Sequence, residues 1–176
     1  VDLAAMLHWA LAESGPSAIR YARSKAPTIG AKDGRDILRG EILRKGSDAV
    51  LLAIGPVISA CLAVAESLAH DGYSVGVADA RWIKPLDGAL LDKLRGTPII
   101  TVEENTLPGG FGAGVIEYYA DHGGLDDLRI RRMGFPDRYI DHATREEQLA
   151  EIGLDFDSIA AAARELVGQR IPHPVS

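Results

Sequence analysis

The chain has 176 residues, of which 47% are hydrophobic, enough for one sizeable core; a domain of this length buries roughly 70% of its unfolded surface. Its 19 Lys and Arg residues stand against 25 Asp and Glu residues, and the net charge of -6 repels polyanions and anionic membranes, so we expect neither nucleic acid nor a membrane as partner. Cys61 is the only cysteine, which excludes an internal disulfide and fits a cytoplasmic protein.

The first residues form too little structure for a core. Apolar residues at helical spacing predict a helix over residues 2–13, and a Ser-Gly-Pro break then precedes a short predicted strand, Ser17–Tyr21. One helix and one strand cannot pack alone, so we interpret residues 1–23 as the end of a truncated upstream domain. Residues 24–39 follow as an interdomain linker, since they are polar and rich in Gly, Pro and charge.

Strand and helix patterns alternate along the rest of the chain. Apolar runs and period-2 segments predict strands at 37–44, 48–54, 74–79, 98–102 and 127–133, the first at a sheet edge. Helical spacing predicts helices at about 58–71, 87–94, 111–120, 144–152 and 157–167, with a capping box at Thr144-Arg-Glu-Glu147. Crossover helices imply a three-layer α/β fold with an open, mainly parallel sheet and helices on both faces. This domain is expected to cover residues 40–168, followed by a mobile tail at 169–176.

The most informative stretch is the glycine-rich turn that follows the predicted strand 98–102. Closely spaced glycines at Gly109, Gly110, Gly112 and Gly114 suggest a dinucleotide site, because they let a backbone approach a pyrophosphate at a helix N-terminus. The spacing differs from that fingerprint, since the third glycine should fall at Val115. A tight turn packed against another subunit is the favoured interpretation, and an independent nucleotide-binding domain stays open as an alternative.

Two neighbouring carboxylates, Glu103 and Glu104, come just before this turn. Two nearby carboxylates can act as a general acid and base, because each shifts the pKa of the other. Adjacent strand residues point to opposite faces, however, so both can address one substrate only if the strand has already ended. We favour salt bridges and helix N-terminal contacts at an interface. The interface loop is expected to comprise Glu103, Glu104, Asn105, Gly109 and Gly110.

Arg20 and Arg23 flank Tyr21 at the end of the first predicted strand and are the best ligand candidates. A guanidinium can hold a phosphate through two parallel hydrogen bonds. From the residues alone, a solvated or interface arginine is the more common case. The five histidines have no second His or Cys at metal-ligand spacing, so no metal site is expected in this chain. No Ser or Cys lies in a sequence context that suggests a nucleophile.

Several stretches together resemble the 1-deoxy-D-xylulose-5-phosphate synthase family: Gly15–Arg23, Asp79–Asp87, Thr101–Asn105 with the glycines after it, the Gly-x-Pro-Asp turn at Gly134, and Glu146–Leu154. The resemblance implies a transketolase C-terminal fold. It also implies that Arg23 binds the phosphate of glyceraldehyde 3-phosphate, with Arg20 and Tyr21 in possible support.

The implied reaction joins pyruvate and glyceraldehyde 3-phosphate with loss of CO2 and serves isoprenoid and thiamine precursor synthesis. The family needs thiamine diphosphate and Mg2+, and by resemblance the residues that bind them belong to upstream domains. We therefore expect no catalytic residue and no bound cofactor in this chain alone. Its expected role is assembly with the upstream domains and with a second copy, as a homodimer. The alternative is a non-catalytic C-terminal subunit of a transketolase or 2-oxoacid dehydrogenase beta-like complex.

Overall fold

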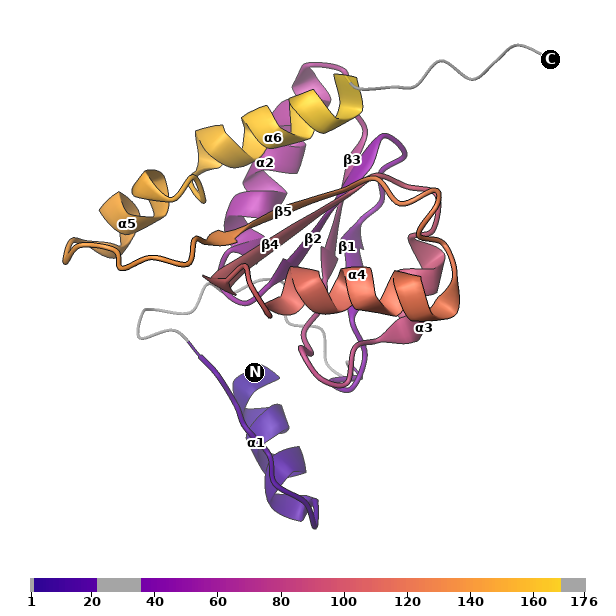
Figure 1. The fold of residues 1–176 in the computed structure, drawn as a ribbon, viewed down its shortest axis with the longest axis vertical. Helices are drawn as coiled ribbons and strands as arrows, with labels where there is room; N and C mark the ends of the chain where they lie inside the picture. Colours follow the sequence, from indigo (N-terminus) through magenta and orange to yellow (C-terminus); the bar gives the residue numbers. More distant parts are fainter. Residues whose placement is uncertain (1, 22–35, 169–176) are drawn as a thin grey trace.

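A five-stranded sheet forms the centre of the protein, in the order β1-β3-β2-β4-β5 (Figure 1). The computed structural model describes residues 2–21 and 36–168. The strands are β1 (Glu41–Arg44), β2 (Ala49–Ile54), β3 (Val75–Asp79), β4 (Ile99–Thr106) and β5 (Ile130–Phe135). Only β1 runs antiparallel to its neighbour, and the other three pairs are parallel. The expected open, mainly parallel sheet is confirmed.

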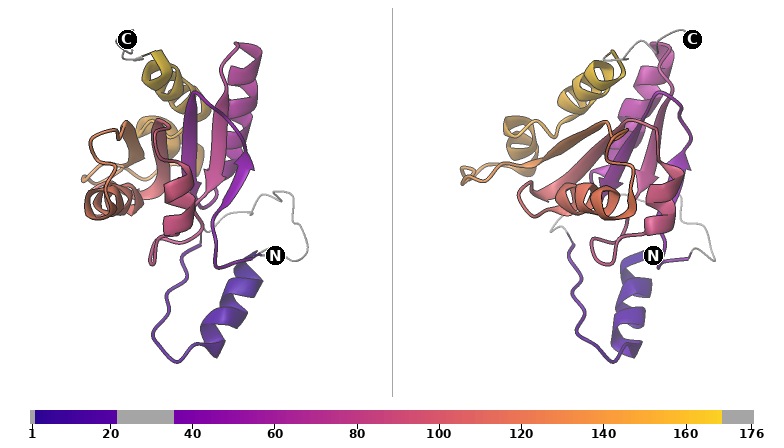
Figure 2. Two further views of the ribbon diagram at one scale, coloured as in Figure 1. Left: turned by 90° about the vertical axis from the view of Figure 1, so that its right-hand side faces the viewer. Right: turned by 45° about the vertical axis from the view of Figure 1, so that its right-hand side comes forward.

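Helices cover both faces of this sheet (Figures 1 and 2). One face packs against α2 (Ile58–His70) and α6 (Phe156–Gly168), and the other against α3 (Gly88–Lys93) and α4 (Phe111–His122). Alternate residues of β2 divide between the two cores: Leu51 and Ala53 face α2, whereas Val50 and Leu52 face α3 and α4. Both faces of the strand are covered, which explains its continuous apolar sequence.

Helix α5 (Arg145–Glu151) begins at the predicted capping box. The Glu147 backbone N–H donates to the Thr144 hydroxyl over 3.3 Å, and the Thr144 N–H donates to the Glu147 carboxylate over 2.9 Å. The Thr144 N–H and the Thr144 hydroxyl both donate to the Glu147 carboxylate, and these two hydrogen bonds hold the pKa of that carboxyl below its usual range. The local sequence therefore fixes where this helix starts.

Three strand predictions need correction. The predicted strand 37–44 pairs only from Glu41, because the residues before it are held by side chains of another loop. β4 continues four residues past the predicted end at Val102. Ser17–Tyr21 forms no strand in the described chain, since neither edge of the sheet lies beside it to supply a hydrogen-bonding partner. The helix before it, α1 (Asp2–Ala12), is formed as predicted. The expected tail at 169–176 and most of the expected linker lie outside the described residues.

We expect Cys61 to lower the free energy of unfolding at alkaline pH. Its side chain lies in the core between α2 and the sheet, and this burial raises the pKa of the thiol to about 12. An unfolded thiol ionises near pH ~8.5, so the stability from the neutral thiol is complete below that pH and is lost as the pH rises toward the folded pKa.

The measurement is the free energy of unfolding of the native chain and of Cys61→Ala between about pH 7 and about pH 10. The native chain should lose stability above pH ~8.5 more steeply than Cys61→Ala. Parallel curves for the two proteins would contradict the assignment.

Candidate functional site at the carboxyl edge of the sheet

The carboxyl ends of β2, β3 and β4 meet at one edge of the sheet, and the loop predicted from Glu103 to Gly110 lies there. Ligands of open α/β sheets bind at this edge. Two loops lie at this edge: the glycine turn between β4 and α4, and the loop between β3 and α3. Each is built around a buried charged side chain.

Glu103 is the buried group of the glycine turn. Its side chain is fully buried in β4, and its two carboxylate oxygens accept the backbone N–H groups of Phe111 and Gly112 at 2.7 and 2.8 Å. Those N–H groups belong to the first turn of α4 and have no partner within the helix. A carboxylate is favourable at this position because the helix dipole is positive here. Glu103 thus fills the place that the pyrophosphate of a dinucleotide would take, which argues against the nucleotide-binding alternative.

Gly110 of the turn and Gly134 of β5 are required by close packing around this carboxylate. A Cβ atom on Gly110 would lie 2.6 Å from the Glu103 carboxylate oxygen and closer still to the Thr106 carbonyl oxygen. A Cβ atom on Gly134 of β5 would lie 3.0 Å from Cγ of Glu103. Gly109 has a φ of 67°, a left-handed conformation that favours glycine. Gly110 and Gly134 therefore leave room for the carboxylate of Glu103.

Glu104 points away from Glu103 and makes different contacts. Its carboxylate forms an ion pair with Arg145 at the start of α5, and its backbone carbonyl accepts a hydrogen bond from Arg20 at 2.5 Å. The neighbouring Asn105 lies in β4 as well, close to Gly134. The two carboxylates therefore do not share one substrate position. That this loop faces another subunit stays a prediction.

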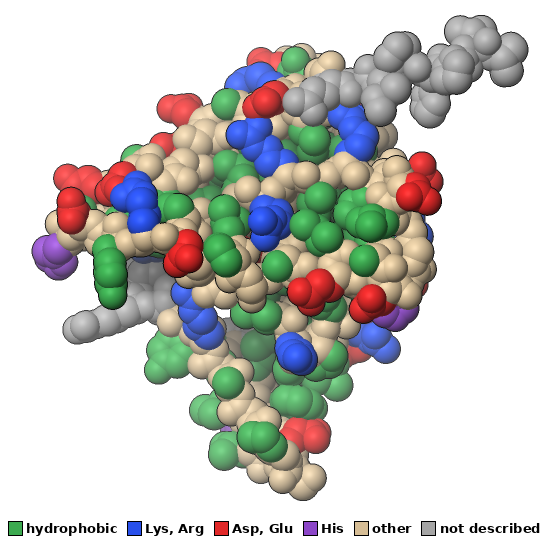
Figure 3. Space-filling model, viewed as in Figure 1, with side chains coloured by type: hydrophobic (Ala, Val, Ile, Leu, Met, Phe, Trp, Pro, Cys, Tyr) green, Lys and Arg blue, Asp and Glu red, His purple; other side chains and the backbone are tan. Residues whose placement is uncertain are grey.

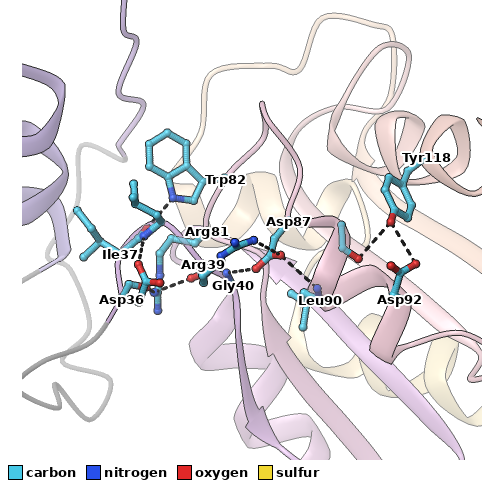
Figure 4. Close-up of polar contacts among 12 residues, drawn as sticks. Asp36, Ile37, Arg39, Gly40, Arg81, Trp82, Asp87, Leu90, Asp92 and Tyr118 are labelled. Atoms are coloured by element: carbon cyan, nitrogen blue, oxygen red, sulfur yellow. Dashed lines mark hydrogen bonds and ion pairs between the residues drawn. The ribbon is translucent and has the colours of Figure 1, made fainter. Parts of the chain in front are cut away.

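Sequence reasoning did not single out the loop after β3 as a set of interacting residues. Arg81 has a positive φ of 61° and a side chain only 3% exposed, paired with Asp79 at 3.3 Å and Glu41 at 3.4 Å. It also donates to the carbonyl oxygens of Asp36 and Arg39 at 2.9 and 2.8 Å (Figure 4). The backbone strain at this residue is compensated by these contacts.

Trp82 and Asp87 also form hydrogen bonds with the residues that lead into β1. The Trp82 indole N–H donates to the Ile37 carbonyl oxygen at 2.6 Å (Figure 4). Asp87 caps α3 by accepting the Leu90 N–H, and it also accepts the Gly40 N–H at 2.9 Å. We call Arg81, Trp82 and Asp87 the clamp. The sequence signal that could have revealed the clamp is a run of charged and aromatic residues directly after a buried strand.

The ligand candidates at the N-terminal end are only partly placed. Arg23 lies outside the described residues, and Tyr21 is 72% exposed.

In the described ranges, no group of three or more His, Cys, Asp or Glu side chains is arranged to hold a metal ion. Side chains of both charges alternate over the face that carries α4 (Figure 3). None of the helices in those ranges has the length and apolar character that crossing a membrane requires.

Comparison with known proteins assigns the family. Residues 38–159 match the family described as "Transketolase, C-terminal domain". The chain belongs to this family. A transketolase C-terminal domain has the mixed five-stranded sheet with helices found here, in agreement with the fold expected from sequence.

The relatives of this transketolase C-terminal domain include proteins named 1-deoxy-D-xylulose-5-phosphate synthase. The one from Anaeromyxobacter dehalogenans is 41% identical over 96% of the chain and 28% of that protein. The one from Magnetococcus marinus is 44% identical over 95% of the chain and 28% of that protein, and the one from Geobacillus thermodenitrificans is 42% identical over 90% and 26%. The chain thus spans about 28% of the length of its first curated relatives.

A solved structure shares the fold of this transketolase C-terminal domain. It is described as "Split gene transketolase, inactive beta4 tetramer" and superposes with a TM-score of 0.75 at 27% identity. The match covers 85% of this chain and 49% of that one. The synthases are therefore more similar in sequence than this transketolase is.

We expect Glu103→Gln to destabilise the protein by about 2 kcal/mol, because an amide N–H2 would face a backbone N–H that now donates to a carboxylate oxygen. The matched control is Glu104→Gln, whose partly exposed pair with Arg145 should cost less than about 1 kcal/mol. Urea unfolding of both variants gives the comparison. Equal losses would show that Glu103 does not hold the start of α4.

We expect Gly110→Ala and Gly114→Ala to change stability in opposite directions. The Cβ of Gly110→Ala would press on Glu103 and Thr106, which should cost about 3 kcal/mol. The nearest atom to a Cβ at Gly114 is Leu86 Cδ1 at 3.5 Å, so alanine fits in the interior of α4 and should add about 0.5 to 1 kcal/mol. Thermal unfolding of both variants tests the difference. A Gly110→Ala protein as stable as the native chain would refute the packing argument.

Proposed function

We propose that this chain is the C-terminal part of a 1-deoxy-D-xylulose-5-phosphate synthase. The observation that supports the proposal most is the 41 to 44% identity to proteins of that name over 95 to 96% of the chain. The split transketolase is 27% identical, so a subunit of a transketolase-like complex is the less favoured alternative. The family match over residues 38–159 and the fold are compatible with both possibilities.

The proposed reaction breaks the bond between C1 and C2 of pyruvate and releases C1 as CO2. A new bond forms between C2 of pyruvate and the aldehyde carbon of glyceraldehyde 3-phosphate, which takes up a proton at its oxygen. Thiamine diphosphate, held with Mg2+, supplies the electron sink that this decarboxylation requires. The product is 1-deoxy-D-xylulose 5-phosphate, a precursor for isoprenoids and thiamine.

The described residues do not fit that cofactor. The N–H groups at the start of α4, which could bind a diphosphate, already donate to Glu103. The described side chains also lack a metal-binding group. We therefore assign cofactor binding and the chemical steps to the other domains of the complete enzyme, and we assign to this part domain assembly and the formation of a homodimer in the cytoplasm. Within residues 1–23, the proposed end of the preceding domain, Arg23 is the residue proposed to bind the phosphate of the aldehyde substrate.

The test is a chimera in which this chain replaces the matching part of the Magnetococcus marinus synthase. With thiamine diphosphate and Mg2+, we expect the chimera to form 1-deoxy-D-xylulose 5-phosphate from pyruvate and glyceraldehyde 3-phosphate. The 176-residue chain alone should give no turnover. A folded, dimeric chimera without activity would overturn the proposal, and so would turnover by the chain alone.

A further inference from the structure

The N-terminal segment, residues 2–21, lies below the carboxyl edge of the sheet (Figure 2). It consists of α1 and an irregular run that returns beside the helix toward the strand ends (Figures 1 and 2). Asp2 and His8 are the ionisable side chains of α1, and the rest of the helix is apolar. A helix that is apolar on all sides is typical of a buried position. The contacts of α1 therefore indicate which partners it needs.

The two sides of α1 differ in exposure. The half-buried residues share one side of the helix, because they recur at helical spacing: Ala5, Met6, Trp9 and Ala10. Leu3, Leu7 and Leu11 follow one another at intervals of four residues and lie on the opposite side. Their exposed fractions are 46%, 50% and 76%. We call these three residues the leucine face.

The half-buried side of α1 packs on the C-terminal domain. Trp9 meets Trp82 edge to face, with ring centroids 4.9 Å apart and an interplanar angle of 83°. Trp82 is itself held, because its indole N–H donates to the Ile37 carbonyl oxygen at 2.6 Å. The returning run adds a second contact, a hydrogen bond from Arg20 to the Glu104 carbonyl oxygen over 2.5 Å. One side of α1 is thus attached, and the leucine face points away from that attachment.

The leucine face fits an apolar partner larger than a second copy of α1. The helix has 11 residues and is about 16 Å long, so two copies paired along it alone would bury less than the roughly 1,200 Å² of a stable dimer. The run beside it, Ser17–Tyr21, has strand-like composition and no neighbouring strand in the described part of the chain. A domain that takes up this run at the edge of its own sheet can also cover the nearby leucines. One partner domain then satisfies both features.

We propose that α1 is shared between two domains: its Trp9 side docks on Trp82 of the C-terminal domain, and its leucine face belongs to the core of the preceding domain. This proposal rests on the proposed function, which places the end of the preceding domain in residues 1–23. The curated relatives have room for such a domain, because the chain spans about 28% of their length. A helix packed into both domains acts as a joint that fixes their relative orientation.

The first experiment tests the docked side in the 176-residue chain. The chain has two tryptophans, so Trp82→Phe and Trp82→Ala each leave Trp9 as the single fluorophore. Both variants lose the bond to the Ile37 carbonyl, and they differ in whether an aromatic ring still faces Trp9. The acrylamide quenching constant of Trp9 should be about twofold higher in Trp82→Ala. Equal constants would show that Trp9 is not docked, and the joint would then be excluded.

The second experiment tests the leucine face in the chimera described above. Leu7→Gln keeps a good helix former but replaces an apolar side chain by a polar one. In the chimera it should speed hydrogen exchange of the α1 amides about tenfold, because a covered leucine is lost. In the 176-residue chain, where Leu7 is exposed, the change should stay below about twofold. The matched control is Leu125→Gln, since Leu125 is 51% exposed in a loop outside α1, and it should leave α1 unchanged in both proteins.

A variant at the end of the helix protects the test against misfolding. If the Leu7→Gln chimera does not fold, Leu11→Gln replaces it, because Leu11 lies in the last turn of α1. The expected result is the same acceleration of exchange in the chimera, with little change in the 176-residue chain.

The outcomes separate this proposal from the proposed function. Unchanged exchange of α1 in the variant chimera overturns the shared helix, whether or not the chimera is active. An inactive chimera in which Leu7→Gln still speeds exchange overturns the proposed function alone, and a parent chimera that does not fold overturns both. Self-association of the 176-residue chain that Leu7→Gln abolishes would place a second copy on the leucine face, and the preceding domain would then be the wrong partner.

Discussion

The carboxyl edge of the sheet depends on one buried carboxylate, that of Glu103. A buried charge is tolerated there because both of its oxygens accept first-turn N–H groups of α4, which otherwise would have no partner. The close approach of strand and helix that these bonds require leaves no room for a Cβ at Gly110. Gly134 is restricted from the other side by the stem of the same side chain. The glycines and the glutamate are therefore one packing unit.

The alternation of side chains along β4 divides two neighbouring carboxylates between the two faces of the sheet. Glu103 holds α4 on one face, and Glu104 holds the start of α5 through Arg145 on the other. One strand end thus fixes elements from both outer layers. The clamp acts at the end of β3, on the other side of β2, where Arg81 and Asp87 tie the entry to β1 to the loop after β3. Local geometry at this edge is set by buried charges, and the cores on either side are apolar.

Periodicity predicted the elements well where packing alone decides them, as in β2 and α4. Periodicity failed where hydrogen bonds from polar side chains decide the backbone conformation. The stretch before Glu41 looks like a strand, but the clamp takes up its carbonyl groups, and no periodic pattern reports that. Ser17–Tyr21 has strand-like composition without a neighbouring strand. Helix N-terminal contacts and salt bridges were predicted for Glu103 and Glu104, whereas the identity of Phe111 and Gly112 as the partners of Glu103 needed the register of β4 against the helix.

The hydrogen bond from Arg20 ends on a peptide oxygen, and this has an evolutionary consequence. Every residue type presents the same carbonyl, so exchange of the side chain at position 104 can leave the docking of the N-terminal segment intact. The two residues of the Glu104–Arg145 ion pair can then be substituted during evolution without loss of that docking. Substitution at Arg20 is more restricted, because the donor is a side chain and its replacement must also donate a hydrogen bond. Selection on the two partners of a single contact is therefore unequal.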